Sequence, residues 1–462
     1  MRRLLRFWSI VGIGWVAAWV ALGSYERLFS NGDGFLAGIN INVLFQYISW
    51  FLLLILFLFI GIKSKHNLAI NLSLSISSLV FFLLVGELLC FFLLKFNMVN
   101  APKPLHTRLC MFEGWSSPER AYWGDYNNDF GSWRLPNDKK EILFCHGDTV
   151  KMKTNSFGMR DSERSLMNEN PKKKRVVMMG DSFLEGYMVN DTSRCSNLLE
   201  KQTGVEHLNF GIKGTSVISY YLKYKHLAKR FEHDVVMVSL LIANDFEDFD
   251  ATKKTGLLKY PIYRPYWDFS TSSPSLKYSL ANISQSLLAN DNYKNPIRTY
   301  YTVDSLYHSL SFKEKIGAEI DLNSYLFNCI MGLATQFAVP KTPTNSFAKE
   351  AYSKRWGVFA HSLEQLALEA KGKKVIVYTV PIANDLRAYQ KAKKDDISPQ
   401  IEAICRKYNI TYINTLPYFY KAGEETWDKL YEPCDGHWTP EGEKFLATIL
   451  LNNLAYCKAV GI

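Results

Sequence analysis

The sequence predicts an α/β protein with a parallel sheet, placed after an N-terminal membrane anchor. Three stretches with no charge or a single charge lie within the first hundred residues, whereas the rest has the mixed composition of a globular chain. From Pro171 onward, short continuous apolar runs alternate with amphipathic stretches of helical period. Continuous apolar runs are typical of strands buried on both faces, and their alternation with helices favours a parallel sheet with helices on both faces.

The apolar stretches at 7–23, 41–62 and 68–94 predict three membrane spans. The first approaches, and the other two exceed, the roughly 20 residues that a helix needs to cross a bilayer core. Basic residues precede the first stretch and follow the second, so the positive-inside rule places the chain after the third span outside the cytoplasm. The first stretch ends in the small residues AWVALGS, which makes a cleaved signal peptide the alternative; its removal leaves the same topology.

Composition bounds the partners and cofactors. The net charge of +10 suits a protein that works near anionic lipid headgroups or an acidic polymer. The run PKKKR at 171–175 lacks interleaved aromatic residues, so we interpret it as a solvated loop and expect no nucleic-acid partner. A pair such as Cys110 and Cys145 can form a disulfide outside the cytoplasm. No CxxC, HExxH or HxH spacing occurs, so we expect neither a metal nor a cofactor.

We expect three parts along the chain: an anchor at 1–96, a loop-rich connection at 97–170, and an α/β domain at 171–462. The connection is rich in Trp, Tyr, Asn, Gly and Pro. The interval at about 246–353 is too long for a simple connection, so we expect a largely helical insertion there. The strands of the domain are predicted at RVVMM (175–179), EHLNF (206–210), DVVMVSLLI (234–242) and KVIVYTV (374–380).

Unusual polar segments follow three of these strands. The sequence GDS at 180–182 follows the first strand, a glycine-containing loop at 211–214 follows the second, and AND at 243–245 follows the third. A fourth segment, CDGHW at 434–438, precedes the terminal helix. In parallel α/β sheets, ligands bind at the carboxyl ends of the strands, where loops and helix N-termini converge. The sequence therefore predicts one site built from these segments.

The order of the four segments resembles the SGNH (GDSL-like) hydrolase superfamily over about 175–250 and 372–455. The resemblance implies a flavodoxin-like, three-layer fold with a serine nucleophile. One feature departs from the common pattern Asp-x-x-His: this chain has Asp435-Gly436-His437, with Cys434 where the usual acid would fall. Asp-x-His followed by Trp is similar to the branch that contains the extracytoplasmic alginate O-acetylation proteins.

The resemblance implies three catalytic residues. Ser182 would be the nucleophile, His437 its general base, and Asp435 the acid that orients the imidazole. A serine hydroxyl needs such a base because it is a poor nucleophile at neutral pH.

The resemblance also implies an oxyanion hole with three hydrogen-bond donors. These are the backbone N–H groups of Ser182 and Gly214 and the side-chain amide of Asn244. Gly211 is the alternative to Gly214. Asp181 is interpreted as a structural residue that orders the turn before Ser182.

These roles predict a membrane-anchored esterase or O-acyltransferase that acts through an acyl-enzyme on ester-linked acyl groups of an envelope glycan or lipid. Water or a sugar hydroxyl would release the acyl group, depending on how the cleft excludes solvent. Because three spans are too few to carry acyl groups across a membrane, a transferase would need a membrane acyl-exporting partner. The aromatic stretch LKYPIYRPYWDF at 258–269 is a candidate acceptor surface. The alternative is a catalytically inactive SGNH-fold binding or scaffold protein in a polysaccharide assembly complex.

Overall fold

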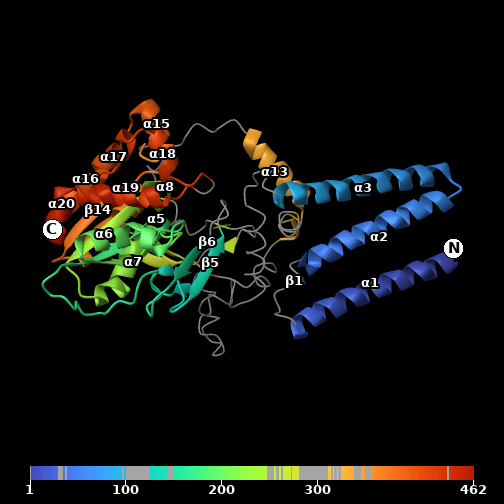
Figure 1. Cartoon of the computed structure of the whole chain (residues 1–462), viewed down its shortest axis with the longest axis horizontal. Helices are drawn as coiled ribbons and strands as arrows, with labels where there is room; N and C mark the ends of the chain where they lie inside the picture. The colour runs from blue at the N-terminus through green and yellow to red at the C-terminus, as the bar shows by residue number, and fades with distance from the viewer. Residues whose placement is uncertain are drawn as a thin grey trace. The chain divides into compact units, whose positions relative to one another are not determined.

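The structure is a computed structural model in which the chain forms two compact units. The helical unit comprises Met1–Tyr122 and Tyr301–Val339, and the α/β unit comprises Trp123–Tyr300 and Pro340–Ile462. Figure 1 labels the elements along the chain. The structure describes residues 2–29, 35–36, 39–95, 98–99, 125–143, 149–246, 254–255, 260–261, 264–271, 273–279, 311–313, 316, 320, 324–337, 345–348, 355–433 and 436–462.

These two units divide the chain differently from the three parts expected from composition. The α/β unit begins within the predicted connection, and the helical unit takes 301–339 from the predicted insertion. Both differences arise from contacts between segments that lie far apart in the sequence.

The helical unit is built on long apolar helices, together with a short strand pair. α2 and α3 run antiparallel and are joined by a turn at 64–66 (Figure 1). Large apolar side chains remain exposed on them; Phe82, for example, is 70% exposed. A helix that is apolar all round is typical of a membrane span. The elements are α1 (Arg2–Phe29), β1 (Phe35–Leu36), β2 (Ile39–Asn40), α2 (Ile41–Lys63), α3 (Asn67–Lys95) and α13 (Tyr325–Phe337).

Two helices, rather than about three, are long and apolar enough to cross a membrane among the described residues: Phe45–Lys63 and Asn67–Leu93. The first predicted span, 7–23, lies in α1, where the apolar stretch is Val11–Leu22. Among its described residues the structure therefore supports two of the three predicted spans.

Glu87, the charged residue of the third predicted span, is paired inside the helical unit. Its carboxylate accepts hydrogen bonds from the backbone N–H of Tyr325 at 2.6 Å and from the hydroxyl of Ser324. Tyr47 of α2 donates a third hydrogen bond at 3.1 Å. Glu87 thereby caps the N-terminus of α13, where a negative charge is favoured by the helix dipole.

A five-stranded parallel sheet forms the centre of the α/β unit, with strand order β15-β14-β9-β7-β8. Numbered along the chain, this order is the flavodoxin-like 2-1-3-4-5. The four predicted strands are confirmed, and β15 is an addition, because its three residues are too few to show an apolar run. The strands are β7 (Arg175–Met179), β8 (Glu206–Asn209), β9 (Val235–Leu241), β14 (Lys374–Val380) and β15 (Thr411–Ile413).

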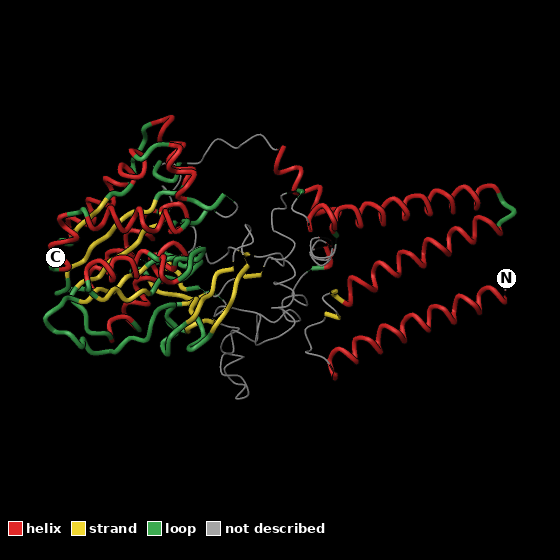
Figure 2. The backbone as a smooth tube through the Cα atoms, in the orientation of Figure 1, coloured by secondary structure: helices red, strands yellow, loops and turns green. Residues whose placement is uncertain are grey.

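Helices cover both faces of this sheet, as Figure 2 shows. The chain moves outward from β7 to β8 through α6 and back past β7 to β9 through α7. Since such crossovers are right-handed, α6 and α7 lie on opposite faces. α14 contacts α7 and α16, while α19 contacts α6. These helices are α6 (Cys195–Thr203), α7 (Val217–His226), α14 (Trp356–Glu369), α16 (Ser398–Lys407) and α19 (Pro440–Leu451).

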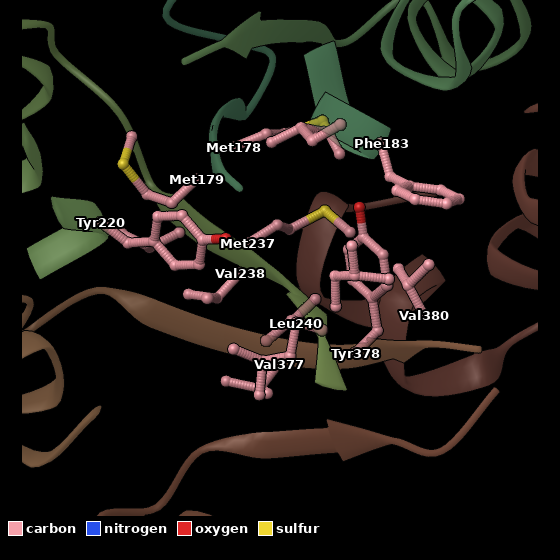
Figure 3. Close-up of a cluster of buried hydrophobic side chains, with 14 of the residues drawn as sticks. Met178, Met179, Phe183, Tyr220, Met237, Val238, Leu240, Val377, Tyr378 and Val380 are labelled. Carbon is pink, nitrogen blue, oxygen red and sulfur yellow. The ribbon is translucent and has the colours of Figure 1, made fainter. Parts of the chain in front are cut away.

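The core of the α/β unit extends up to the turn that carries Ser182. All seven residues of β9 are buried, as are all five of β7. Figure 3 shows Met178, Met237 and Tyr378, from three neighbouring strands, in one cluster with Phe183. Because Phe183 follows Ser182 directly, packing of this core fixes the backbone on which Ser182 sits.

The predicted connection contains strands in addition to loops. Its described residues form two antiparallel pairs, β3 with β4 and β5 with β6. Short strands of this kind are hard to predict because their few residues carry no clear alternation. The strands are β3 (Asp125–Asn127), β4 (Gly131–Trp133), β5 (Lys139–Leu143) and β6 (Thr149–Lys153).

The described part of the predicted insertion contains strands as well as helix. Besides α13 it contains two antiparallel strand pairs, β10 with β11 and β12 with β13. Trp267 donates to the hydroxyl of Ser362 at 3.0 Å, and its ring stacks on Tyr221. This part of LKYPIYRPYWDF therefore packs on α7 and α14. The strands are β10 (Lys254–Thr255), β11 (Tyr260–Pro261), β12 (Pro265–Asp268) and β13 (Ser275–Tyr278).

Candidate active site

Ser182 is the first residue of a short helix, α5 (Ser182–Glu185), that starts just beyond the carboxyl end of β7. Asp181 is its N-cap and accepts a hydrogen bond from the backbone N–H of Phe183 at 3.0 Å. Gly180 is needed because a Cβ there would lie 2.7 Å from the Cβ of Leu184. The strand, the glycine and the cap together hold Ser182 at the edge of the sheet.

The imidazole of His437 lies against the Ser182 hydroxyl. Ser182 Oγ and His437 Nε2 are 2.8 Å apart, although the two residues are separated by 255 positions in the sequence. The ring of His437 packs on Phe183 and Tyr187, with centroid distances of 4.9 and 5.3 Å. The backbone N–H of Glu432 donates to the His437 carbonyl at 2.7 Å. The hydroxyl of Ser182 and the imidazole of His437 are therefore held in hydrogen-bond contact, the arrangement that general-base activation of a serine needs.

Asn244 lies at the same edge of the sheet, in α8 (Ile242–Asp245) directly after β9. Its side-chain amide donates to Asp181 Oδ2 at 3.2 Å. Because an amide nitrogen carries two hydrogens, one remains for a ligand. Asp181 therefore joins the turn of Ser182 to the end of β9, which agrees with its interpretation as a structural residue.

Gly214 and Gly211 differ in what their surroundings allow. Gly214 is exposed, has a φ of +69°, and its surroundings leave a Cβ position with no atom within 4 Å. The N–H of Gly211 donates to Asn209 Oδ1 at 2.8 Å, and a Cβ at this position would lie 2.5 Å from the backbone nitrogen of Glu185. The packing and hydrogen bonding of Gly211 leave it a structural role, so Gly214 is the better candidate for a donor to a ligand.

A buried ionic pair lies beneath the glycine loop. Glu185 is fully buried, pairs with Arg134, and accepts the backbone N–H of Lys213 at 2.7 Å. Arg134 is also buried and donates to the Gly211 carbonyl at 3.4 Å. Burial alone would raise the pKa of Glu185, but Arg134 and Arg160 hold it below its ordinary value. The ionised pair fixes the loop on both sides of Ile212.

Arg160 is a buried structural residue. Its guanidinium is 1% exposed and donates to the carbonyls of Gly186 and Val189, both at 2.5 Å. It also pairs with Asp191 at 3.0 Å. These contacts hold the chain that leaves the helix of Ser182.

Sequence reasoning missed Arg134 and Glu185. Glu185 lies three residues after Ser182 in the first turn of a helix, where an acid is ordinary. Arg134 lies in the predicted connection, 51 positions before Glu185 in the printed numbering. No local pattern pairs residues so far apart.

Lys223 of α7 is a further buried charge behind this site. It is fully buried, donates to the Phe210 carbonyl at 2.7 Å, and lies 5.3 Å from the ring centroid of Trp133. Burial lowers its pKa to about 7, and Arg134 adds to this shift while Glu185 opposes it.

We expect Lys223→Met to remove a pH-dependent part of the stability. The folded pKa of about 7 lies below the ordinary 10.5, so the unfolded chain binds more protons between these values. The free energy of unfolding of the wild type therefore rises with pH through this window. Below the window, the cost of burying the charged Lys223, on the order of 4 kcal/mol, applies in full. Thermal unfolding of both proteins from about pH 6 to about pH 10 should show the advantage of the variant shrinking as pH rises. A constant difference, or the same trend in the Lys225→Met control, would contradict this.

Four residues named from the sequence lie outside the described residues. Asp435, the predicted orienting acid, and Cys434 fall between Pro433 and Gly436, where the structure resumes. Cys110 and Cys145, the predicted disulfide pair, also lie outside it. Five described cysteines are free thiols: Cys90, Cys195, Cys329, Cys405 and Cys457.

No protein-family model and no curated protein sequence matches the chain. Among solved structures, a lipase/acylhydrolase from Enterococcus faecalis is 9% identical with a TM-score of 0.32, covering 61% of this chain and 95% of its own. A member of the lipolytic G-D-S-L family from Veillonella parvula is 14% identical with a TM-score of 0.28, covering 61% and 97%. A catalytic mutant of an acetylxylan esterase from Geobacillus stearothermophilus is 13% identical with a TM-score of 0.31, covering 63% and 94%.

Proposed function

We propose that this protein is a membrane-anchored serine esterase or O-acyltransferase of the SGNH type. The observation that carries the proposal is the 2.8 Å contact between Ser182 Oγ and His437 Nε2 at the carboxyl edge of a parallel sheet. The order of the four sequence segments, with Gly214 and Asn244 at the same edge, supports the SGNH type in particular.

The chemistry proceeds in two halves. Ser182 Oγ attacks the acyl carbonyl while His437 Nε2 takes the hydroxyl proton. The tetrahedral oxyanion accepts hydrogen bonds from the N–H groups of Ser182 and Gly214 and from the Asn244 amide. His437 then gives its proton to the departing alcohol, which leaves an acyl ester on Ser182. Water or a sugar hydroxyl, deprotonated by His437, reverses these steps and releases the acyl group.

The helical unit supports the proposed location at a membrane. The two helices that are long and apolar enough to cross a membrane support an anchor. Lys63 and Lys65 between them favour a turn on the cytoplasmic side, so the chain after Lys95 would lie outside the cytoplasm. Two such helices are too few to carry acyl groups across a membrane, so a transferase would draw them from a membrane acyl-exporting partner.

The alternative is a binding or scaffold protein with no turnover. The purified full-length chain in detergent, given p-nitrophenyl acetate, distinguishes the two, because an enzyme of this type should release p-nitrophenol above the detergent blank. An acetylated donor is then added with a neutral oligosaccharide acceptor, and the products are read by mass spectrometry. Acetylated acceptor indicates a transferase, whereas free acetate alone indicates an esterase. If no ester is cleaved, the alternative of a binding or scaffold protein would be favoured.

A further inference from the structure

A pocket of about 580 Å³ opens in the α/β unit beside the imidazole of His437. Three parts of the chain form it: Phe183, the described residues 431–433 and 436–437, and the facing ends of two helices. These helices are α15 (Ala383–Ala392) and α18 (Glu424–Leu430). The volume lies within the roughly 300–1,000 Å³ of small-molecule sites and is far larger than a water molecule needs.

The position of the pocket assigns it to one half of the ester. In serine catalysis the imidazole passes its proton to the departing alcohol oxygen and later takes one from the incoming hydroxyl. The alcohol side therefore lies toward His437, whereas the acyl oxygen lies toward the oxyanion donors. His437 lines the pocket, while neither Gly214 nor Asn244 is among its lining residues. The pocket thus faces the alcohol.

The inner wall of the pocket is apolar. Phe183, Trp427 and Tyr431 line it, and each is at most 5% exposed. The polar tips of two of them are used within the protein: the Trp427 indole donates to the Phe419 carbonyl and the Tyr431 hydroxyl to the Pro381 carbonyl, both at 2.6 Å. These side chains therefore offer ring carbon to a ligand. Ring carbon packs against the C–H face of a sugar.

The rim of the pocket is polar and carries no excess of positive charge. Arg387 of α15 and Asp428 of α18 form a 2.7 Å ion pair, with 38% and 63% of their side chains exposed. Asn384 is exposed next to them, and the acidic Glu432 lines the same pocket. Amide, guanidinium and carboxylate groups bind hydroxyls through several directed hydrogen bonds. A strongly anionic ligand would meet two acids, Asp428 and Glu432, and one cation, Arg387.

We propose that this pocket holds a neutral sugar, as the alcohol that carries the acyl ester or accepts it. The inference rests on the proposed function and makes it specific, because an apolar wall with a hydroxyl-binding rim fits a neutral glycan. A lipid alcohol would leave the ion pair and Asn384 facing its hydrocarbon chain, which is unfavourable for polar groups.

The test uses three esters that share the acetyl group and differ in the alcohol: acetylated cellobiose, dodecyl acetate and p-nitrophenyl acetate. The full-length protein in detergent should cleave the cellobiose ester with a higher kcat/KM than dodecyl acetate. The informative quantity is kcat/KM for acetylated cellobiose divided by kcat/KM for p-nitrophenyl acetate. In Asn384→Ala and in Arg387→Ala this ratio should fall about tenfold for each hydrogen bond lost. The fall should come mainly from a higher KM for acetylated cellobiose. Lys391→Ala, further along α15, is the control and should keep the wild-type ratio.

A second measurement, inhibition by free cellobiose, tests sugar binding even if a variant loses activity because it misfolds. Free cellobiose should inhibit p-nitrophenyl acetate hydrolysis competitively in the wild type and about tenfold more weakly in Asn384→Ala. An unchanged substrate ratio in both pocket variants, or a preference for dodecyl acetate, would overturn the sugar pocket while leaving the enzyme intact. Failure of the wild type to cleave any of the three esters would overturn the proposed function itself.

Discussion

Ser182→Ala is expected to lower kcat/KM for p-nitrophenyl acetate by at least about 10⁴-fold. The substitution removes the hydroxyl that would form the acyl ester, while His437 and the oxyanion donors remain in place. Ser182 is 6% exposed and lies at the start of α5, where its backbone is set by Asp181. Loss of one oxygen at this position should leave the melting temperature close to that of the wild type.

The matched control for this loss is Ser162→Ala, an exposed serine of the same unit, which should keep wild-type kcat and KM. Hydrolysis is followed by the release of p-nitrophenol, with the detergent blank subtracted. Equal rates for Ser182→Ala and wild type would show that the ester is cleaved elsewhere, and the assignment of the nucleophile would fail.

Asn244→Ala should lower kcat by about 10²–10³-fold with little change in KM, as expected for a donor that acts on the oxyanion. The carbonyl oxygen of the ester carries full negative charge in the tetrahedral state. The missing hydrogen bond therefore destabilises this state more than it weakens substrate binding. The 3.2 Å contact with Asp181 holds the amide in position.

Two comparisons separate this effect from a structural one. Asn170→Ala, at an exposed site near the amino end of β7, should leave kcat unchanged. In Asn244→Ala the free energy of unfolding should fall by no more than about 1 kcal/mol, the contribution of one hydrogen bond. Thermal unfolding measures this change. A rise in KM with unchanged kcat would assign Asn244 to substrate binding instead.

The strands and the residues that follow them were predictable from local sequence. RVVMM and KVIVYTV are apolar throughout because both faces of their strands are covered, and these segments are β7 and β14. The topology of parallel sheets then brings GDS and AND to one edge. Such inferences need a few neighbouring residues and a general rule about sheets.

The residues beneath the site required long-range information. Arg134 comes from a segment that composition describes as a loop, and its partner Glu185 is a common residue for the first turn of a helix. Their pairing depends on how the chain before β7 packs on the loop after β8. Charge patterns along the sequence carry no such information.

The helical unit shows the same limit. Glu87 is the single charge of a predicted span, and its role as the cap of α13, about 240 residues further along the chain, depends on tertiary packing. Hydropathy along the chain carries no such information.

The contact between Ser182 and His437 is tested most directly with a fluorophosphonate probe, which reacts covalently with a serine that an adjacent base activates. Peptide mass spectrometry of the labelled full-length protein should find the adduct on Ser182. The rate of labelling should fall by about 10²-fold or more in His437→Ala. An adduct absent from Ser182, or an unchanged labelling rate in His437→Ala, would contradict the account.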